Sequence, residues 1–279
     1  MRADVSVIIP SYNRAHCIER ALCSVFEQNS LPQQVIVVDD GSTDRTQALI
    51  RHKYPQVRLI SQSNRGVSAA RNAGIAAADT EFIAFLDSDD AWLPHKLQRQ
   101  VAWMQDHPDC VFSHTEEIWI RNGVRVNPMN KHRKSGGLIY SHCLPLCVIS
   151  PSSVIIRRVL LEQVGGFDET LPACEDYDLW LRICSRFPVA FLEEPLLLKY
   201  GGHADQLSRK YWGMDRYRIT ALIKMLDSGW LDAENTKLTV EMLRKKCRIF
   251  IKGARKHKNI EDIGKYEAIL SSYDYEPAL

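Results

Sequence analysis

Several features of secreted and membrane proteins are missing from this sequence of 279 residues. No signal peptide follows Met1, because the first apolar run is cut short by Pro10. No apolar stretch approaches the ~20 residues that a membrane-spanning helix requires. The sequence therefore predicts a soluble, cytoplasmic protein.

Paired cysteine spacings are also lacking among the 8 cysteines. Cys143 and Cys147 form one C-x-x-x-C, but no second pair completes a zinc site. We therefore expect reduced thiols, most of them buried, as is usual in a cytoplasmic protein.

Neither sign of charge is in excess, since 36 Lys and Arg oppose 34 Asp and Glu for a net charge of +2. This balance argues against a nucleic-acid partner. Basic residues are nevertheless concentrated late in the chain, in runs at Arg244–Arg248 and Arg255–Lys258. Two interpretations remain open: the runs are solvated helix faces, or they make a peripheral contact with the inner face of an anionic membrane.

What the chain does contain is a regular alternation of strand and helix patterns. The expected strands are Val5–Ile9, Val35–Val38, Arg58–Ile60 and Phe82–Leu86. The expected helices include Ile18–Val25, a helix capped by Ser42 or Thr43 and reaching Ile50, Val67–Ala78 and Leu93–Asp106. This β-α-β order predicts right-handed crossovers and a largely parallel sheet, with ligands bound beyond the carboxyl ends of the strands.

The later part of the chain is mixed and then helical. Strand patterns recur at Cys110–Phe112, Ser153–Ile156 and Val189–Leu192, and helical patterns at Asp176–Arg186, Tyr211–Leu226, Thr236–His257 and Ile260–Ser271. The polar, basic stretch Arg121–Gly137 predicts a hairpin or a mobile loop.

Four polar clusters follow strands or open helices: Pro10–Asn13, Asp39–Ser42, Asp87–Asp90 and Cys174–Asp176. Each alone has an ordinary explanation as a turn or a helix start, and Asp90 in particular is expected to be an N-cap. Their joint position at one edge of one sheet favours a site. Carboxylates at Asp87 and Asp89 are what a hard cation such as Mg²⁺ or Mn²⁺ needs to neutralise a leaving diphosphate.

At this point several segments resemble family 2 glycosyltransferases of the GT-A fold, in order and at the usual spacing from about Val5 to Ser208. The segments that carry the resemblance are Val5–Arg14, Val37–Asp44, Gly66–Gly74, Phe85–Asp90, Gly165–Glu169, Glu175–Arg182 and His203–Gln206. The resemblance implies a GT-A α/β domain over residues 1–207, with a nucleotide-sugar-binding part to about 110, and a helical segment over residues 208–279.

The resemblance also implies roles for individual residues. Donor-binding roles fall to Pro10, Tyr12, Asn13, Asp40, Arg71, Asp87 and Ser88. Within this set Asp40 is expected to accept a hydrogen bond from the base, most often uracil.

Metal and catalytic roles follow in the same way. Asp89 is the expected direct ligand of Mn²⁺ or Mg²⁺, with Asp87 and His203 supporting it. Asp176 is expected to be the catalytic base, beside Glu175.

The implied activity is inverting transfer of one sugar from a nucleotide-diphosphate sugar, such as a UDP-sugar, to an acceptor hydroxyl in cell-surface glycan or polysaccharide biosynthesis. The acceptor is expected to be a glycan or a lipid-linked molecule. Processive relatives carry Q-x-x-R-W, whereas Gln206-Leu207-Ser208-Arg209 is followed here by Lys210. The loop Arg121–Gly137 and the region near Cys174 are expected to select the sugar and the acceptor.

Other functions are less consistent with the residues. A nucleotidyltransferase needs a Gly-rich basic loop after the first strand, and a dehydrogenase needs G-x-G-x-x-G there, and neither is found. A non-catalytic nucleotide-sugar-binding module remains as the alternative. Two details stay open: Arg71 is a donor contact or a solvent-facing helix residue paired with an acid, and Trp92 meets a sugar or packs in the core. Trp180 and Leu181 are expected in the core.

Overall fold

A computed structural model describes residues 2–202, 211–258 and 263–273. Its internal contacts divide the chain into two compact units, each built from segments distant in sequence. The first comprises Met1–Leu138, Val148–Pro172 and Phe187–His203, and the second comprises Ile139–Cys147, Ala173–Arg186 and Ala204–Leu279. The domain boundary expected between 207 and 208 lies outside the described residues. Within the described ranges, no helix combines the length and hydropathy needed to span a bilayer.

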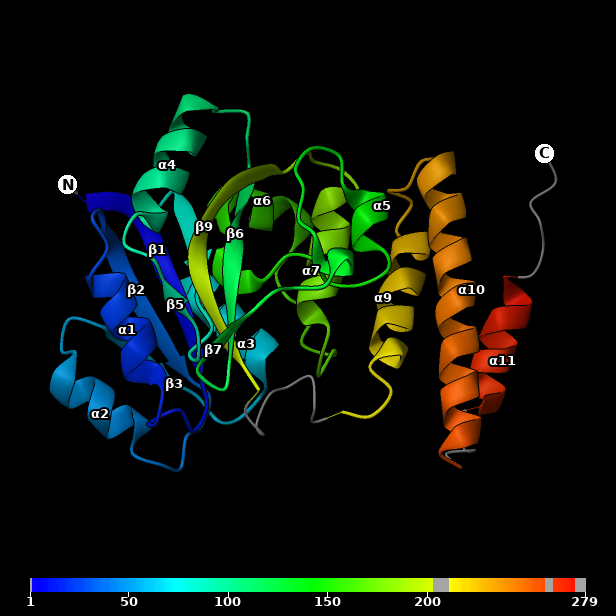
Figure 1. The fold of residues 1–279 in the computed structure, drawn as a ribbon, viewed down its shortest axis with the longest axis horizontal. Coiled ribbons are helices and arrows are strands. Elements are labelled where there is room, and N and C mark those ends of the chain that lie inside the picture. Colours follow the sequence, from blue (N-terminus) through cyan, green and yellow to red (C-terminus); the bar gives the residue numbers. More distant parts are fainter. Residues whose placement is uncertain (1, 203–210, 259–262, 274–279) are drawn as a thin grey trace. The chain divides into compact units, whose positions relative to one another are not determined.

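The first unit begins with four parallel strands in the order β3-β2-β1-β4. They are β1 (Arg2–Ser11), β2 (Leu31–Asp39), β3 (Arg58–Ser61) and β4 (Phe82–Phe85). The helices between them are α1 (Ile18–Phe26), α2 (Thr46–Lys53) and α3 (Val67–Ala77). The predicted strand and helix alternation is therefore confirmed for this half of the sheet (Figure 1).

Helices cover both faces of these strands. On one face, Ile18 of α1 and Leu97 of α4 (Lys96–Asp106) belong to one buried cluster with Val7 of β1. On the other face Ala70 of α3 joins the cluster of β2. The small residues of α3 allow this approach, since a Cβ at Gly74 would lie 2.4 Å from Ile8 Cγ2.

The remaining strands of the first unit pair in both directions. They are β8 (Ile155–Arg157), β6 (Phe112–Arg121), β9 (Ala190–Gly201), β5 (Ala91–Trp92) and β7 (Val124–Val126). Beyond β4 the sheet runs β8-β6-β9-β5, with only β6 and β9 parallel, and β7 forms a hairpin with β6. The expected parallel arrangement thus holds for the first four strands. Of the hairpin and the mobile loop expected for Arg121–Gly137, the hairpin is confirmed at the start of the stretch, where β7 pairs with β6. The short helix α6 (Arg158–Val164) follows β8.

The second unit is helical in its described residues. Its helices are α5 (Tyr140–Cys143), α7 (Glu175–Cys184), α9 (Asp215–Asp227), α10 (Ala233–Lys256) and α11 (Ile263–Ser272). α9 packs against α7 and α10, and α10 also packs against α11. Asp232 caps α10 by accepting a hydrogen bond from Asn235 N at 2.7 Å. Trp180 and Leu181 of α7 are buried, as expected.

The eight cysteines are free thiols, and five of them are buried. This agrees with the expectation of reduced, mostly buried cysteines.

Candidate functional site

The loops that follow β1 and β2 are joined by Asn13. Its backbone adopts a positive φ of 54°, and its Oδ1 accepts a hydrogen bond from Thr43 N at 2.8 Å. Its own backbone N–H donates to Ser42 Oγ at 2.8 Å. The predicted capping of α2 by Ser42 or Thr43 is therefore wrong, because both residues are engaged by Asn13. The helix begins at Thr46, whose N–H donates to Asp44 Oδ1 at 2.9 Å.

Pro10 and Tyr12 flank the end of β1 in different environments. Pro10 is buried and lies beside Val38 of β2 in the parallel register. Tyr12 is 44% exposed, so its ring reaches the surface immediately beyond the strand.

Asp40 is buried and holds the start of α3. Its Oδ1 accepts hydrogen bonds from Gln62 Nε2 at 2.7 Å and from Arg65 N at 2.9 Å. Its Oδ2 accepts one from Gly66 N at 2.8 Å, directly before the helix. Asp40 thus fixes the helix that carries Arg71, and its contact with a base stays a prediction.

The structure brings Arg71 and Asp87 together. Arg71 is only 3% exposed, and its Nη2 lies 2.8 Å from Asp87 Oδ1. The guanidinium also lies over the ring of Phe167, 5.0 Å from its centre. The pairing of Arg71 with an acid is therefore confirmed, whereas its expected solvent-facing position is wrong, and its contact with the donor stays a prediction. Asp87 keeps 32% of its side-chain surface exposed, so a ligand can reach the carboxylate that Arg71 orients.

Asp87 begins a tight turn, and Ser152, which is distant in sequence, holds both ends of this turn by hydrogen bonds. Asp90 N donates to Asp87 O at 3.0 Å, which closes the turn. Ser152 Oγ accepts from Asp87 N at 3.0 Å and donates to Asp90 Oδ2 at 2.6 Å. Asp90 Oδ1 accepts from Tyr200 N at 2.9 Å. The predicted N-cap role of Asp90 is wrong, because the chain continues into β5 and the buried carboxylate connects the turn to β9 instead.

The turn concentrates negative charge. Burial raises the pKa of Asp90 well above its ordinary value, and the charges of Asp89 and Asp87 raise it further. The carbonyl of Asp89 accepts a hydrogen bond from the Arg20 guanidinium, which lies 3.7 Å from the centre of the Tyr200 ring.

The donor set of this turn fits a hard divalent cation. Asp87 and Asp89 offer carboxylate oxygens on one short turn, and Ser88 between them is buried. No group of three His, Cys, Asp or Glu suited to a metal occurs within the described part of the chain. Two protein carboxylates with phosphate oxygens and water are, however, the usual environment of Mg²⁺. His203 lies outside the described residues.

Trp92 belongs to the core beneath the turn. It is buried, its Nε1 donates to Ser152 O at 2.7 Å, and the ammonium of Lys96 lies 4.4 Å from its ring centre. Of the two interpretations of Trp92, core packing is the correct one.

Glu175 and Asp176 open α7 in the second unit, as expected. The residue before them, Cys174, has a positive φ of 63°, a conformation that is uncommon for residues other than glycine. Glu175 is buried, whereas Asp176 is partly exposed and accepts a hydrogen bond from Cys147 Sγ at 3.2 Å. The nearby Asp178 has a different environment, since its buried carboxylate contacts Arg182 and Lys224.

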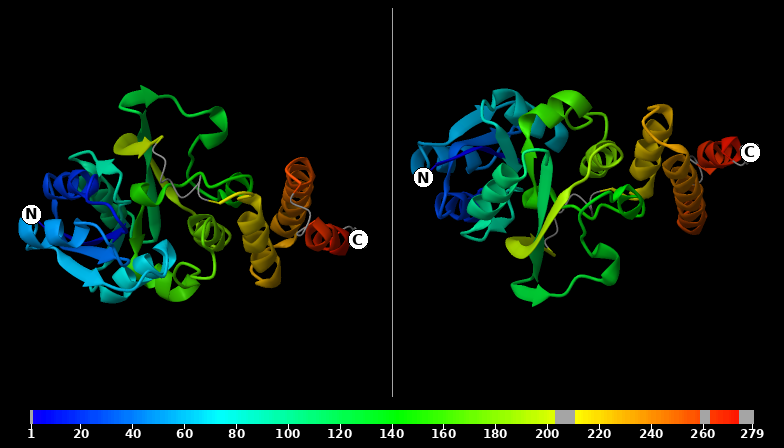
Figure 2. Two further views of the ribbon diagram at one scale, coloured as in Figure 1. Left: turned by 90° about the horizontal axis from the view of Figure 1, so that it is seen from below. Right: turned by 90° about the horizontal axis from the view of Figure 1, so that it is seen from above.

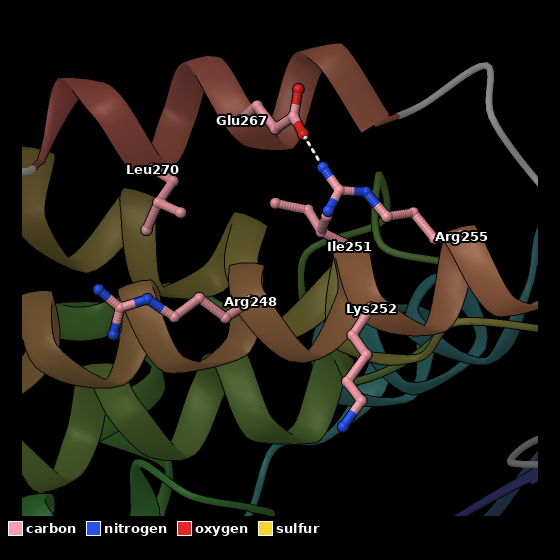
Figure 3. Close-up of a pocket in the computed structure, with 6 residues that line it drawn as sticks. All are labelled: Arg248, Ile251, Lys252, Arg255, Glu267 and Leu270. Atoms are coloured by element: carbon pink, nitrogen blue, oxygen red, sulfur yellow. Dashed lines mark hydrogen bonds and ion pairs between the residues drawn. The ribbon is translucent and has the colours of Figure 1, made fainter.

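The basic runs of the second unit divide between the interior and the surface. Lys246 is buried and donates to Pro145 O at 2.8 Å. A cavity of about 360 Å³ lies between α10 and α11, lined by Arg248, Ile251, Lys252, Arg255, Glu267 and Leu270 (Figure 3). There Arg255 contacts Glu267 at 2.6 Å, while Lys252 extends away from α11. None of the predicted site residues that the structure describes lines this cavity.

Residues 6–165 match the sequence model described as glycosyl transferase family 2, and residues 133–226 match that of glycosyltransferase-like family 2. Four curated relatives from Rickettsia species and Nostoc, named as glycosyltransferases, are 30–34% identical over 66–81% of this chain. The chain spans only 27–60% of their length.

Two further relatives have more specific names. The Escherichia coli UDP-Glc:α-D-GlcNAc-diphosphoundecaprenol β-1,3-glucosyltransferase WfgD is 32% identical over 64% of this chain and 69% of its own. The Bacillus subtilis putative teichuronic acid biosynthesis glycosyltransferase TuaG is 28% identical over 85% of this chain and 96% of its own.

Among solved structures, Staphylococcus aureus TarS (residues 1–349) in complex with UDP-GlcNAc has a similar fold. The TM-score is 0.76 at 21% identity, covering 98% of this chain and 80% of that one. The expected GT-A fold is thereby confirmed.

Proposed function

Because the chain belongs to glycosyl transferase family 2, we propose that it transfers one sugar, with inversion, from a UDP-sugar to an acceptor hydroxyl. The observation that carries this proposal is the acidic turn at the end of β4, where buried Arg71 orients the partly exposed Asp87. A structural turn would not require a buried guanidinium directed at a carboxylate that stays accessible.

The donor is proposed from the relatives together with the loops beyond β1 and β2. WfgD uses UDP-Glc by its name, and TarS was solved with UDP-GlcNAc. Here Asn13 holds the two loops together, and Tyr12 presents an exposed ring beside them. The residue before Tyr12, Ser11, accepts a hydrogen bond from Asp40 N at 2.8 Å, and an exposed aromatic ring is suited to stack on a base.

Asp89 and Asp87 would hold Mn²⁺ or Mg²⁺, which supplies positive charge to the leaving diphosphate when it is bound. The chain itself orients the Asp87 carboxylate and fixes the turn that carries Asp89. Ser152 and Asp90 fix the backbone of the turn, and Arg71 fixes the side chain of Asp87. This arrangement keeps the ligands in place before the donor arrives, so that little reorganisation is needed.

Asp176 is proposed as the general base. Its carboxylate would take the proton of the acceptor hydroxyl as that oxygen attacks C1 and the bond from C1 to the diphosphate oxygen breaks. Its partial exposure lets an acceptor approach, while the Cys147 thiol donates to Oδ2 and limits its rotation. General-base assistance of this kind is worth about 10²–10⁴-fold in rate.

The acceptor is proposed to be a lipid-linked saccharide of cell-surface polysaccharide biosynthesis. WfgD is named for a diphosphoundecaprenol-linked acceptor, and TuaG for teichuronic acid biosynthesis. We propose no nucleic-acid partner, since the net charge is +2.

The test is a thermal-shift screen of nucleotide sugars with and without Mn²⁺, followed by a transfer assay with the donor that stabilises most. Stabilisation grows with the ratio of ligand concentration to dissociation constant, so the true donor gives the largest shift. Binding that depends on Mn²⁺ and is followed by release of UDP supports the proposal. Tight binding of a UDP-sugar without turnover on any acceptor would favour the alternative, a non-catalytic binding module.

A further inference from the structure

The most exposed apolar side chains of the described residues lie together in one segment, Arg121–Leu138. Leu138 is 79% exposed, Val124 64% and Met129 61%, whereas the next large apolar residue, Ile249, is 50% exposed. Single exposed apolar residues are ordinary, but three within one short segment are not. These three side chains require an explanation.

The same segment carries positive charge without any acidic residue. Arg121, Arg125, Lys131 and Arg133 are all exposed. No Asp or Glu occurs in the sequence between Glu117 and Glu162. The surface of the segment is therefore both apolar and cationic.

The segment is anchored to strand β6 at its base. The buried Lys134 donates to Glu117 Oε2 at 2.8 Å and to Thr115 O at 3.0 Å. Trp119 Nε1 donates to Glu117 Oε1 at 2.7 Å, and the ring of His132 packs 5.1 Å from the Trp119 ring. Lys134 and Trp119 hold the Glu117 carboxylate, and Lys199 lies 3.7 Å from its Oε1, so the charge of Glu117 is engaged at the base of the segment.

The far end of the segment is held as well. Gly137 N donates to Val189 O at 2.7 Å, and Val189 N donates to Gly137 O at 3.0 Å. In both views of Figure 2 the hairpin and the following loop, in green, project away from the strands of their unit. The segment is thus an anchored projection with an apolar and basic surface.

We propose that Arg121–Leu138 docks on an anionic lipid bilayer. The four cations would meet headgroup phosphates, while Val124, Met129 and Leu138 would enter the boundary between headgroups and acyl chains. An acidic protein would match the charges but would gain little from apolar side chains spread along a loop. The inference goes beyond the proposed function, because docking involves no sugar transfer, and it would bring the chain to a lipid-linked acceptor.

The experiment is flotation of the full chain with vesicles of phosphatidylcholine, or of phosphatidylcholine mixed with phosphatidylglycerol. One variant replaces Arg121, Arg125, Lys131 and Arg133 with Gln, and a second carries Val124→Ser, Met129→Ser and Leu138→Ser. The matched control replaces four exposed arginines elsewhere in the first unit, namely Arg2, Arg45, Arg51 and Arg99, with Gln. A competing variant replaces Lys245, Arg248, Lys252 and Lys256 of the exposed α10 surface with Gln.

We expect the wild type to float with the anionic vesicles and to be released by salt, because screening weakens surface attraction. Each removed charge should lower the affinity roughly fivefold, since a basic residue near an anionic surface contributes ~1 kcal/mol. The apolar variant should also lose binding, and the matched control should retain it. Melting temperatures of the variants without ligand that stay close to that of the wild type show that the fold is intact.

The inference is overturned if the wild type does not bind anionic vesicles, or if both segment variants bind as the wild type does. It is equally overturned if only the α10 variant loses binding, which assigns docking to that helix. Self-association of the wild type that the apolar variant abolishes, without vesicle binding, would make the segment a contact between copies of the chain. Since none of these readouts involves transfer, failure here leaves the proposed function untouched.

Discussion

The guanidinium of Arg71 lies 2.8 Å from the carboxylate of Asp87, and the two side chains differ sharply in exposure. The arginine is buried within α3 and against Phe167, whereas the aspartate keeps about a third of its surface open. A buried cation held against an accessible carboxylate orients one oxygen and leaves the group open to a ligand. This relationship is the basis of the first prediction.

Arg71→Met should lower both stability and catalysis. Removing one partner of a buried ion pair leaves the other uncompensated, but Asp87 can regain water, so we expect a loss of about 1–3 kcal/mol in the free energy of unfolding. Loss of carboxylate orientation should lower kcat/KM by ~10²-fold or more. Urea unfolding and initial-rate kinetics measure the two effects. The double variant Arg71→Met/Asp87→Asn should recover part of the stability and none of the activity, and recovery of activity would contradict the assigned role.

Asp176 and Asp178 provide a matched pair on one helix. Asp176→Asn should remove turnover and leave stability and the donor-induced thermal shift nearly unchanged, because the carboxylate is partly exposed, forms no ion pair with any residue that the structure describes, and is similar in size to the Asn amide. Asp178→Asn should instead destabilise the protein by about 3 kcal/mol or more, because it weakens the buried contacts with Arg182 and Lys224. Transfer assays and thermal unfolding separate the two. Near-normal transfer by the Asp176 variant would exclude this residue as the base.

Asp89→Asn should abolish the effect of Mn²⁺ on donor binding. If Asp89 holds the cation, the thermal shift produced by UDP in the presence of Mn²⁺ should fall to the small shift seen without metal. Stabilisation by mass action at 100 times the dissociation constant is about 2.7 kcal/mol, so its loss is easily measured. Asp79→Asn, on an exposed loop after α3, serves as the control. An undiminished shift in the Asp89 variant would place the metal elsewhere.

The sequence predicts most of the fold and the components of the site, for physical reasons. Continuous apolar runs at β1, β2 and β4 indicate strands buried on both faces, and parallel order follows from the helices between them. The helix starts are less well predicted. Ser42 has the chemistry of a cap but accepts from Asn13, because the loop after β1 is adjacent in space and distant in sequence.

The hydrogen bonds that hold the site together could not be predicted from local sequence patterns, because they join residues that are distant in sequence. Ser152 is 65 residues from Asp87 along the chain, yet its hydroxyl fixes the acidic turn. One local signal does point to such a contact, namely the polar residues Ser150-Pro151-Ser152-Ser153 shortly before the apolar β8. Polar side chains next to a buried strand are themselves buried and therefore need hydrogen-bond partners. The partly exposed carboxylate of Asp87 and the buried one of Asp90 look alike in sequence. Only tertiary contacts distinguish the accessible carboxylate from the buried one.

Lys96 gives the last prediction, which concerns pH. Its side chain is fully buried, donates to Gln100 Oε1 at 2.6 Å and lies over the Trp92 ring beneath the acidic turn. Burial lowers the pKa of this ammonium well below its ordinary value of 10.5, and the charge of Lys134 lowers it further. The folded state therefore binds fewer protons than the unfolded state between the lowered pKa and 10.5. The contribution of Lys96 to stability thus rises with pH through that interval, by up to about 1.4 kcal/mol per pH unit.

Lys96→Met removes this titration and keeps the length of the side chain. We expect the variant to be more stable than the wild type near pH 7, because the cost of burying a charge is gone, and the advantage to shrink as the pH approaches 10.5. Subtracting the free energy of unfolding of the wild type from that of the variant at each pH cancels the contributions of the other groups that titrate in this range. Urea unfolding at a series of pH values measures it, with Lys245→Met on the exposed surface of α10 as the control, for which the difference should stay constant. A constant difference for Lys96→Met as well would mean that Lys96 titrates alike in the folded and unfolded chain, and that its burial costs nothing.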